Sequence, residues 1–400
     1  MGRAWSEGRR IGVLGPVALA DFDDLLPGQD LAGDRLPGLG GPPVHWHVRE
    51  LLRRGRRVTL FTLDPTIDGE RVFEGDRLKI CVGPYTRHRG RAFFRREIGY
   101  LRDALRREQP DILSAHWTYE FAAAAIASGI PHVVTAHDAP WRILRHNPSP
   151  YRLVRTAMAY MVGRTARRLV AVSPYVADHL RRFGFRTGAI DVIPNALPPI
   201  LTGKQSARRT SGTEPVFAGI FSGGWDGLKN GATLIEAFAM VRRRLPGARL
   251  LLVGAECGPA GPAAAWASAR GLDVGVRFAG RLPHPHVLDW LGTEIDVLVH
   301  VSREEAFGLT LIEAAACGVP VIAGRDSGAV PWILGDGAYG QLVDVGSAIA
   351  VAQAMMDLAQ NEGRRSALAA AARRAARERF DIVAVTDRYE DIFASLSRQT

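Results

Sequence analysis

Short apolar runs alternate with segments of helical spacing along most of the chain. Residues 10–14, 58–63 and 169–173 are apolar runs of the length typical of buried strands. Residues 44–54 and 151–168 instead place their apolar side chains three or four positions apart, as an amphipathic helix does. This alternation predicts an α/β fold in which helices cover parallel sheets.

One stretch without periodicity divides the chain. It begins at Leu197 and mixes Pro, Gly, Ser, Thr and Arg, a composition typical of a linker. A chain of 400 residues is also too long for one compact core and fits two domains of ordinary size. We therefore predict a first domain over residues 1–198, a linker over 199–215, a second domain over 216–378 and a last helix within 379–400.

The stretch from Ser302 to Gly324 predicts a loop, a helix and a strand in immediate succession. Phe307 and Gly308 break the regular pattern, and residues 309–316 have helical spacing. Gly318 can close that helix in the left-handed conformation before an apolar strand follows. A glycine turn that opens a helix leaves backbone N–H groups unpaired beside the positive end of the helix dipole, which makes it a binding site for phosphate.

Two carboxylates flank this phosphate site. Glu305 lies just before it, and Glu313 lies one turn inside the predicted helix. Eight helical residues would rise about 12 Å, so the two carboxylates are too far apart to share a proton. Carboxylates accept hydrogen bonds from sugar hydroxyls, and the expected ligand is a phosphate flanked by polyols, which describes a nucleotide sugar.

Two further glycine loops precede predicted helices. Gly40 and Gly41 lead into the helix from residue 44, where a plain turn is the alternative interpretation. Gly223 and Gly224 lead into a second helix through Lys229. A lysine supplies a compact positive charge that suits a diphosphate, and only three of the 51 cationic residues of this chain are lysines.

Polar side chains also end two predicted strands of the first domain. His116 ends one strand, and His137 and Asp138 end the next. Ligand groups in open parallel sheets gather at the carboxyl ends of the strands, although His116 could equally be a core histidine bonded to backbone. His284 and His286 are expected to be loop residues without a ligand role.

The motif S-x-x-E-x-F-G-x-x-x-x-E-A, followed by G-x-P-V, resembles the E-x7-E signature of retaining glycosyltransferases of family 4. Elements resembling PD-x-x-x-x-H, T-x-H-D, I-P-N, F-x-G and G-x-L-V follow the family order. The resemblance is strong over residues 216–343 and weaker before residue 169. It implies the GT-B fold: two Rossmann-like domains with parallel sheets facing across a deep cleft, and a C-terminal helix returning to the first domain.

The resemblance also implies roles for the residues of the second domain. Glu313 would hold the ribose hydroxyls and Glu305 the hexose hydroxyls of the donor. Gly224 stands where the family has an arginine, so Lys229 would neutralise the diphosphate either alone or with an arginine from elsewhere in the chain. Arg281 is a candidate for the base pocket. Backbone N–H groups at the helix start would cap phosphate oxygens, namely those of Phe307, Gly308 and Leu309.

In the first domain, the resemblance places His137 against the transferred sugar. The loop of Gly40 and Gly41 would face the donor, and Gly223 and Gly224 would do so from the second domain. His116 and Asp138 are assigned to the acceptor side. We count Glu305, His137 and Lys229 as the catalytic residues.

The implied activity is retaining, metal-independent transfer of a sugar from a nucleoside diphosphate sugar. The acceptor would be a hydroxyl of a glycan, a lipid-linked molecule or a small molecule, in cell-envelope or exopolysaccharide assembly. A lysine in place of a divalent metal agrees with a chemistry that needs no metal and no cofactor. A GT-B sugar-nucleotide epimerase is the alternative, and a basic non-catalytic protein that binds membrane or nucleic acid is the second alternative.

Charge and cysteine content add expectations about partners and location. The net charge is +10, which favours an anionic partner, but no aromatic-and-basic module predicts nucleic-acid binding. The arginine-rich segment 87–108 carries an apolar stripe that includes Phe93 and Phe94. Either this stripe is buried, or the helix lies on anionic lipid. Three widely spaced cysteines predict buried thiols, and we expect a cytoplasmic protein, with contact at the inner face of the membrane left open.

Overall fold

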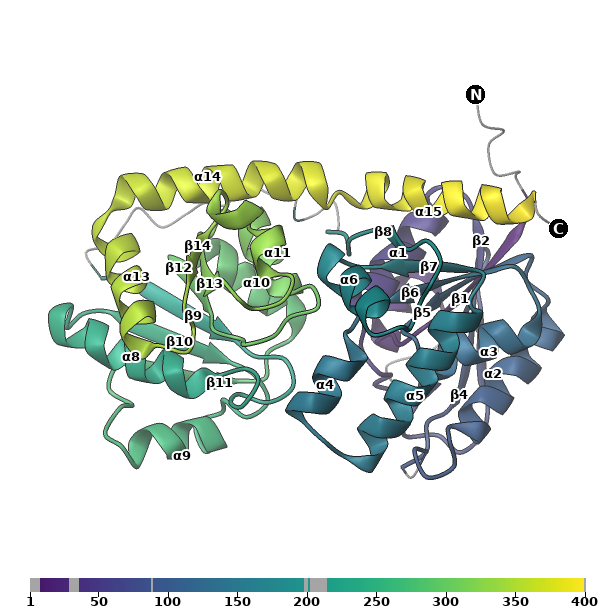
Figure 1. Ribbon diagram of the computed structural model, residues 1–400, viewed down its shortest axis with the longest axis horizontal. Coiled ribbons are helices and arrows are strands. Elements are labelled where there is room, and N and C mark those ends of the chain that lie inside the picture. The colour runs from purple at the N-terminus through teal and green to yellow at the C-terminus, as the bar shows by residue number, and fades with distance from the viewer. Residues whose placement is uncertain (1–7, 29–35, 88, 198–200, 202–213, 399–400) are drawn as a thin grey trace. The chain divides into compact units, whose positions relative to one another are not determined.

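The computed structural model describes residues 8–28, 36–87, 89–197, 201 and 214–398 (Figure 1). The chain forms two compact units, and unit 1 combines residues 1–196 with residues 382–400. Unit 2 comprises residues 197–381. Nearly all of the predicted linker, residues 199–215, lies outside the described residues.

Unit 1 is built on a sheet of eight strands in the order β3-β4-β2-β1-β5-β6-β7-β8. All neighbouring strands are parallel except β3 and β4, which pair antiparallel at one edge. The strands are β1 (Arg10–Leu14), β2 (Arg57–Asp64), β3 (Arg71–Glu74), β4 (Leu78–Pro84), β5 (Ile112–His116), β6 (His132–Ala136), β7 (Arg168–Ala171) and β8 (Asp191–Val192).

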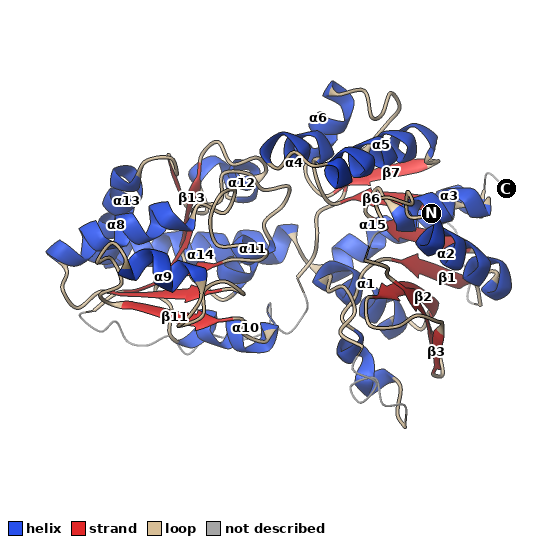
Figure 2. Cartoon of the chain, turned by 90° about the horizontal axis from the view of Figure 1, so that it is seen from below, coloured by secondary structure: helices blue, strands red, loops and turns tan. Residues whose placement is uncertain are grey.

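Helices surround this sheet (Figure 2). Helix α3 packs against α2 and α5, while α1 packs against α15. The helical elements of unit 1 are η1 (Leu19–Leu25), α1 (Pro42–Arg53), α2 (Arg95–Glu108), α3 (Glu120–Ser128), α4 (Pro140–His146), α5 (Pro150–Thr165), α6 (Pro174–Arg182) and α15 (Ile382–Ser397).

Serine and proline set the starts of two helices of unit 1. The hydroxyls of Ser149 and Ser173 each accept a backbone N–H, at 3.2 Å, at the first turn of α5 and α6. A proline follows each serine, and its fixed φ suits the first helical position. Helix α1 likewise begins at Pro42, two residues before the predicted start, because prolines are tolerated in a first turn.

The predicted apolar stripe of segment 87–108 is only partly correct. Helix α2 begins at Arg95, and Phe93 and Phe94 precede it with φ angles of 49° and 55°. Leu101, Leu105 and Phe94 are buried, whereas Phe93 is 61% exposed. The stripe of α2 therefore belongs to the core, and Phe93 faces away from it.

The last helix, α15, packs on the rest of unit 1 as predicted (Figure 1). Arg54 at the end of α1 forms ion pairs with Asp387 at 2.7 Å and Glu390 at 3.0 Å. The hydroxyls of Tyr389 and of Thr135 on β6 lie 2.9 Å apart. Both the charges and the buried hydrogen bond tie the C-terminal helix to this sheet.

Unit 2 is built on a six-stranded parallel sheet in the order β11-β10-β9-β12-β13-β14. Its strands are β9 (Val216–Ile220), β10 (Arg249–Val253), β11 (Val276–Gly280), β12 (Val297–His300), β13 (Val321–Gly324) and β14 (Gln341–Val343). Its helical elements are α8 (Gly231–Arg244), α9 (Pro262–Ser268), α10 (His284–Thr293), α11 (Leu309–Ala316), α12 (Val330–Ile333), η2 (Gly335–Gly337), α13 (Ala348–Gln360) and α14 (Glu362–Arg379).

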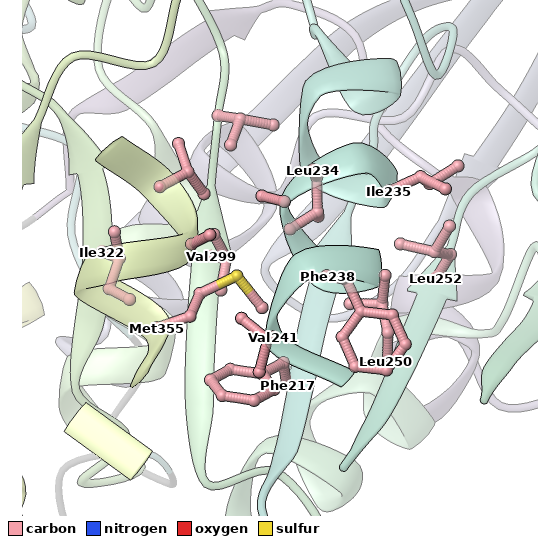
Figure 3. Close-up of a cluster of buried hydrophobic side chains, with 14 of the residues drawn as sticks. Phe217, Leu234, Ile235, Phe238, Val241, Leu250, Leu252, Val299, Ile322 and Met355 are labelled. Carbon is pink, nitrogen blue, oxygen red and sulfur yellow. The ribbon is translucent and has the colours of Figure 1, made fainter. Parts of the chain in front are cut away.

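A close-packed apolar cluster fixes the central strands of unit 2 (Figure 3). Phe217 of β9 and Val299 of β12 lie in it with Phe238 of α8 and Met355 of α13. Strands β9 and β12 are neighbours, with Ala218 opposite Leu298. The strand order changes direction between them, because β10 follows on one side and β12 on the other, and ligands bind at such a switch point in open α/β sheets.

The three cysteines are buried free thiols, as predicted. Burial raises the pKa of Cys81 to about 11 and that of Cys257 to about 12, so both remain protonated at neutral pH. Within the described ranges, no helix combines the length and the apolar character needed to cross a lipid bilayer.

Candidate functional site

The N-terminus of α11 has the predicted form. The helix runs from Leu309 to Ala316, and Gly308 precedes it with a φ of +88°. No side chain caps this end. Phe307 is buried, with its ring 5.7 Å from that of Phe380. The aromatic anchor fixes the loop, while the glycine lets the backbone turn and present N–H groups at the start of the helix.

Lys229 and Glu305 are direct neighbours. Lys229 Nζ lies 2.6 Å from Glu305 Oε1, and His300 Nε2 lies 3.1 Å from the same oxygen. Lys229 follows β9 and Glu305 follows β12, so the pairing of these two strands places them together. We call Lys229, His300 and Glu305 the charged cluster.

Asn230 holds the lysine loop in place. It is buried, has a φ of +59°, and its Nδ2 donates to the carbonyls of Val301 at 3.2 Å and Val345 at 2.7 Å. Arg303 Nη2 in turn donates to Asn230 Oδ1 at 3.0 Å. An asparagine tolerates the left-handed conformation better than most residues, and here it joins the loop after β9 to the loop after β12.

A second glycine fixes the backbone of Glu305. Gly328 has a φ of +65°, and a Cβ there would lie 2.3 Å from the carbonyl oxygen of Glu305. The N–H of Ala329 donates to that same oxygen at 2.9 Å. Only glycine allows this approach, so the position of Glu305 depends on Gly328.

The neighbours of Glu305 keep it ionised. Burial by itself would raise the pKa of its carboxyl, but the hydrogen bond from His300 and the charge of Lys229 outweigh burial and hold the pKa well below its usual range. Glu305 is therefore a carboxylate at neutral pH. It can accept hydrogen bonds from hydroxyl groups, and it is not a source of protons.

Glu313 has a partner that the sequence did not suggest. It is 3% exposed, and His284 Nε2 lies 2.8 Å from its Oε1. The expectation that His284 and His286 are loop residues is wrong, because both lie in α10, and His284 reaches across from the start of that helix to α11. Arg281 is exposed between β11 and α10, three positions before His284.

The glycines after β9 leave open space in their loop. Gly223 and Gly224 have φ angles of +77° and +91°. A Cβ at Gly223 would meet nothing within 4 Å, and one at Gly224 would lie 3.7 Å from Glu256 Oε2. That carboxylate accepts the N–H of Trp225 at 3.0 Å and so braces the loop. The backbone at Gly223 is accessible to a ligand.

In unit 1, the loop of Gly40 and Gly41 lies beside the end of β1. Gly41 has a φ of +126°, and a Cβ there would lie 2.2 Å from the carbonyl oxygen of Pro16. Gly40 has a φ of +70°, and its Cβ position is open. The close approach explains why the residue before α1 is glycine, and Gly40 leaves the loop accessible.

Histidines from α1, from β5 and from the position directly after β6 lie close together in unit 1. His116 Nδ1 and His137 Nε2 lie 3.0 Å apart, so one ring donates to the other. Trp117 stacks on His137 with ring centroids 4.2 Å apart. The ring of His47 lies 4.8 Å from that of Tyr389. We call His47, His116 and His137 the histidine cluster.

Burial keeps the histidine cluster neutral. It lowers the pKa of His137 to about 3, that of His47 to about 4, and that of His116 well below its usual value. Among the described residues, neither ring nitrogen of His47 finds a hydrogen-bond partner. A neutral imidazole can donate one hydrogen bond and accept another without bringing charge to the site.

Asp138 follows His137 and faces a different set of groups. Its Oδ2 accepts the hydroxyl of Tyr119 at 2.8 Å, and the guanidinium of Arg155 lies 3.5 Å from the centre of the Tyr119 ring. Burial raises the pKa of Asp138, although Arg155 opposes this. Of the residues predicted for the site, the structure brings together Lys229 with Glu305 in unit 2, and His116 with His137 in unit 1.

Comparison with known protein families identifies both halves of the chain. The model described as Glycosyltransferase Family 4 matches residues 44–199, and the model described as Glycosyl transferases group 1 matches residues 211–375. A D-inositol 3-phosphate glycosyltransferase of Segniliparus rotundus is 33% identical over 230 residues. That match covers 54% of this chain and 50% of the relative, so it spans half of the relative's length.

Solved structures share the whole fold at low identity. Sucrose-phosphate synthase from Thermosynechococcus elongatus superposes with a TM-score of 0.75 at 18% identity, over 98% of this chain and 100% of that one. HepE of Anabaena, solved in complex with UDP-glucose, gives 0.68 at 19% identity over 96% and 99%. The GT-B fold expected from the sequence is confirmed, and the chain belongs to glycosyltransferase family 4.

Proposed function

We propose that this protein is a retaining glycosyltransferase that moves a sugar from a nucleoside diphosphate sugar to an acceptor hydroxyl. The charged cluster beside the start of α11 carries the proposal. It combines a lysine, an ionised carboxylate and a helix N-terminus within one loop system of unit 2. The lysine and the helix N-terminus suit a diphosphate, and the ionised carboxylate suits a sugar hydroxyl.

The diphosphate is bound by backbone and by one side chain. N–H groups of Phe307, Gly308 and Leu309 point to phosphate oxygens, and Lys229 adds a full positive charge. Gly223 and Gly224 let the loop after β9 approach the same anion without side chains in the way. These groups stabilise the negative charge that develops on the departing nucleoside diphosphate.

The carboxylates recognise the two sugars of the donor. Glu305 accepts hydroxyls of the transferred hexose, and its partners Lys229 and His300 keep it ionised for that purpose. Glu313 accepts the ribose hydroxyls, with His284 fixing its orientation. Arg281 is the candidate contact for the base.

In unit 1, His137 contacts the transferred sugar as a neutral hydrogen-bonding group. Gly40 and Gly41 carry no side chains, so the donor can approach the backbone of their loop closely. His116 orients His137 through the 3.0 Å contact between their rings. Asp138 and His116 lie on the acceptor side.

The reaction we propose needs no covalent enzyme intermediate. The bond between the anomeric carbon and the β-phosphate oxygen breaks, and the acceptor oxygen forms its bond to that carbon on the same face. The acceptor proton passes to the departing phosphate oxygen, so the products are the glycosylated acceptor and the nucleoside diphosphate. No metal and no cofactor enters this scheme, because Lys229 supplies the counter-charge.

The acceptor is a hydroxyl of a glycan, a lipid-linked molecule or a small molecule. The relative from Segniliparus rotundus is named for D-inositol 3-phosphate, a small phosphorylated polyol. HepE was solved with UDP-glucose, so uridine diphosphate sugars are the first donors to test. We place the enzyme in the cytoplasm, in cell-envelope or exopolysaccharide assembly.

A panel of nucleotide sugars tests donor binding directly. A ligand that binds only the native state stabilises it, by about 2.7 kcal/mol at a concentration one hundred times its Kd. We expect one donor to raise the thermal midpoint and to yield free nucleoside diphosphate when the acceptor is added. If the donor is epimerised or hydrolysed without an acceptor, the epimerase alternative replaces this proposal.

Glu305→Gln separates catalysis from nucleotide binding. We expect turnover to fall by about a hundredfold or more, the usual effect of removing one preorganised group, while the Kd for the nucleoside diphosphate changes little. Glu313→Gln is the matched control, because it should weaken nucleotide binding first. The assignment of Glu305 is wrong if its variant loses only thermal stability and keeps its turnover.

A further inference from the structure

Helix α5 presents apolar side chains on the side that faces solvent. Leu153 is 58% exposed, Tyr160 46% and Met161 59%. Together with Ala157 they recur at helical spacing, so they form one stripe along the helix. The opposite side of α5 is already buried through Met158, Ala159 and Val162. The exposed stripe is therefore not needed for the core of unit 1.

Neighbouring elements extend this stripe into a broader surface. Trp141 of α4 and Phe183, directly after α6, lie beside it with ring centroids 6.2 Å apart. Phe93, two residues before the start of α2, adds a third exposed ring. Together they line an open groove of about 640 Å³. We call this the α5 apolar surface; its most exposed members are Phe93, Trp141, Leu153, Tyr160, Met161 and Phe183.

The segments that carry most of this surface are rich in arginine, although α6, before Phe183, also carries the exposed Asp178. Residues 139–177, which include all of α4 and α5, contain seven arginines and no aspartate or glutamate. Residues 84–96, which carry Phe93, contain five more arginines and again no acidic residue. Arg145 and Arg164 are among the exposed members of these segments. A contiguous apolar patch of this kind marks an interaction site, and its rim selects an anionic partner.

We propose that the α5 apolar surface docks on a lipid bilayer that contains anionic lipids. The aromatic rings and Met161 enter the interfacial region, where Trp and Tyr are favoured, and the arginines contact lipid phosphates. This inference goes beyond sugar transfer, since docking requires neither donor nor acceptor. It also moves the membrane contact from the stripe of α2, which is buried, to α5.

A second copy of the chain fits this surface less well. In a symmetric dimer the same patch meets itself, so the arginine rim of one protomer would face that of the other. Like charges brought together in this way oppose association. An anionic bilayer supplies both the apolar depth and the opposite charge.

Vesicle co-sedimentation of the full chain tests the proposal. We expect binding to vesicles of phosphatidylcholine and phosphatidylglycerol in equal parts, weaker binding at high salt, and little binding to phosphatidylcholine alone. Met161→Asp should reduce the affinity about tenfold or more, because it removes an apolar side chain that would enter the bilayer and adds a repelled charge. Ile349→Asp is the matched control, since Ile349 is 61% exposed in unit 2.

A second pair of variants tests the arginine rim. Arg164→Gln should weaken binding to the mixed vesicles about fivefold, the contribution of one basic residue near an anionic surface. Arg244→Gln, an exposed arginine at the end of α8, should leave binding unchanged. Nucleotide-induced thermal stabilisation should be the same in all four variants, so membrane docking and donor binding are tested separately.

Three results would overturn the proposal. One is wild-type protein that stays unbound to both kinds of vesicle. Another is binding that Met161→Asp and Ile349→Asp reduce equally. The third is a dimer in solution that Met161→Asp dissociates while vesicles are not bound, which would assign the surface to a second copy.

Discussion

The charged cluster of unit 2 and the histidine cluster of unit 1 are built on the same kind of scaffold. Each lies at the carboxyl end of parallel strands, and each contains a buried imidazole. In unit 2, His300 contacts the carboxylate of Glu305, which also contacts Lys229. In unit 1, His116 and His137 contact each other, and within the described part of unit 1 no carboxylate forms an ion pair with either ring.

The difference shows how burial acts on a site with and without counter-charges. Glu305 remains ionised inside the protein because a lysine and a histidine compensate for the lost water. Among the described residues His137 contacts no group of opposite charge, and burial lowers its pKa so that it is neutral. A diphosphate requires the charged arrangement, whereas a sugar hydroxyl can be recognised by a neutral one.

Of the changes that test this difference between the two clusters, Lys229→Met should have the largest effect on turnover and stability. It removes the only lysine of the charged cluster, so we expect turnover to fall by about a hundredfold to a thousandfold. It also leaves the carboxylate of Glu305 with fewer partners, which should cost about 1 to 3 kcal/mol of stability. Steady-state kinetics and chemical unfolding of unit 2 measure the two effects.

A double variant separates the structural from the catalytic part of that loss. Lys229→Met with Glu305→Gln removes both charges, so stability should recover towards the wild type while turnover stays low. If turnover recovers together with stability, Lys229 acts only by holding the loop. The positive charge of Lys229 would then have no catalytic role, and the charged cluster would not differ from the histidine cluster in that respect.

Acid should destabilise the histidine cluster before the charged cluster. The pKa of His47 is about 4 in the folded state and 6.5 when exposed, so the unfolded chain binds more protons as pH falls through this window. Each such histidine can cost about 2 kcal/mol between neutrality and pH near 5. The lowered pKa of Glu305 also favours the native state at neutral pH, but that stability is lost only below about 4.5.

His47→Phe measures how much of the stability lost in acid is due to His47. The thermal midpoint of unit 1 should depend less steeply on pH, and stability near neutrality should be kept, because the described residues offer no hydrogen bond to either ring nitrogen. His286→Phe, at an exposed position of unit 2, should leave the slope unchanged. If the thermal midpoint of His47→Phe depends on pH as steeply as that of the wild type, His47 does not cause the loss of stability in acid.

The smallest effect concerns the helix that completes unit 1. Tyr389→Phe removes the hydrogen bond to Thr135 beside the histidine cluster, and we expect a loss of about 1 kcal/mol. Tyr160→Phe, at an exposed position, should change stability by less than about 0.5 kcal/mol. Equal effects of the two changes would mean that α15 is not held through this bond.

Local signals in the sequence were sufficient for several elements. The bounds of β1 and α11 agree with the prediction at both ends, because a short apolar run and a glycine-bounded helical pattern define them. The rarity of lysine in this chain and the preceding glycine loop indicate Lys229 as a site residue. Its contact with Glu305, 76 positions away, depends on the pairing of β9 with β12, which local pattern does not encode.

Other features depend on tertiary structure alone. His284 meets Glu313 only because α10 and α11 pack together, and nothing near His284 in the sequence indicates this contact. Phe93 and Phe94 continue the helical spacing of α2, yet both adopt positive φ angles outside the helix. Spacing therefore could not reveal that one of them is core and the other part of the α5 apolar surface.

The scarcity of lysine gives this chain a built-in chemical reporter. Its three lysines are Lys79, Lys204 and Lys229, and Lys79 lies 2.9 Å from Glu108. Acylating reagents that attack primary amines will not modify the arginines around the α5 apolar surface. Mass spectrometry can measure the acylation of Lys229 in the one peptide that contains it. Protection of that amine by a bound donor would measure occupancy in the untagged, native enzyme.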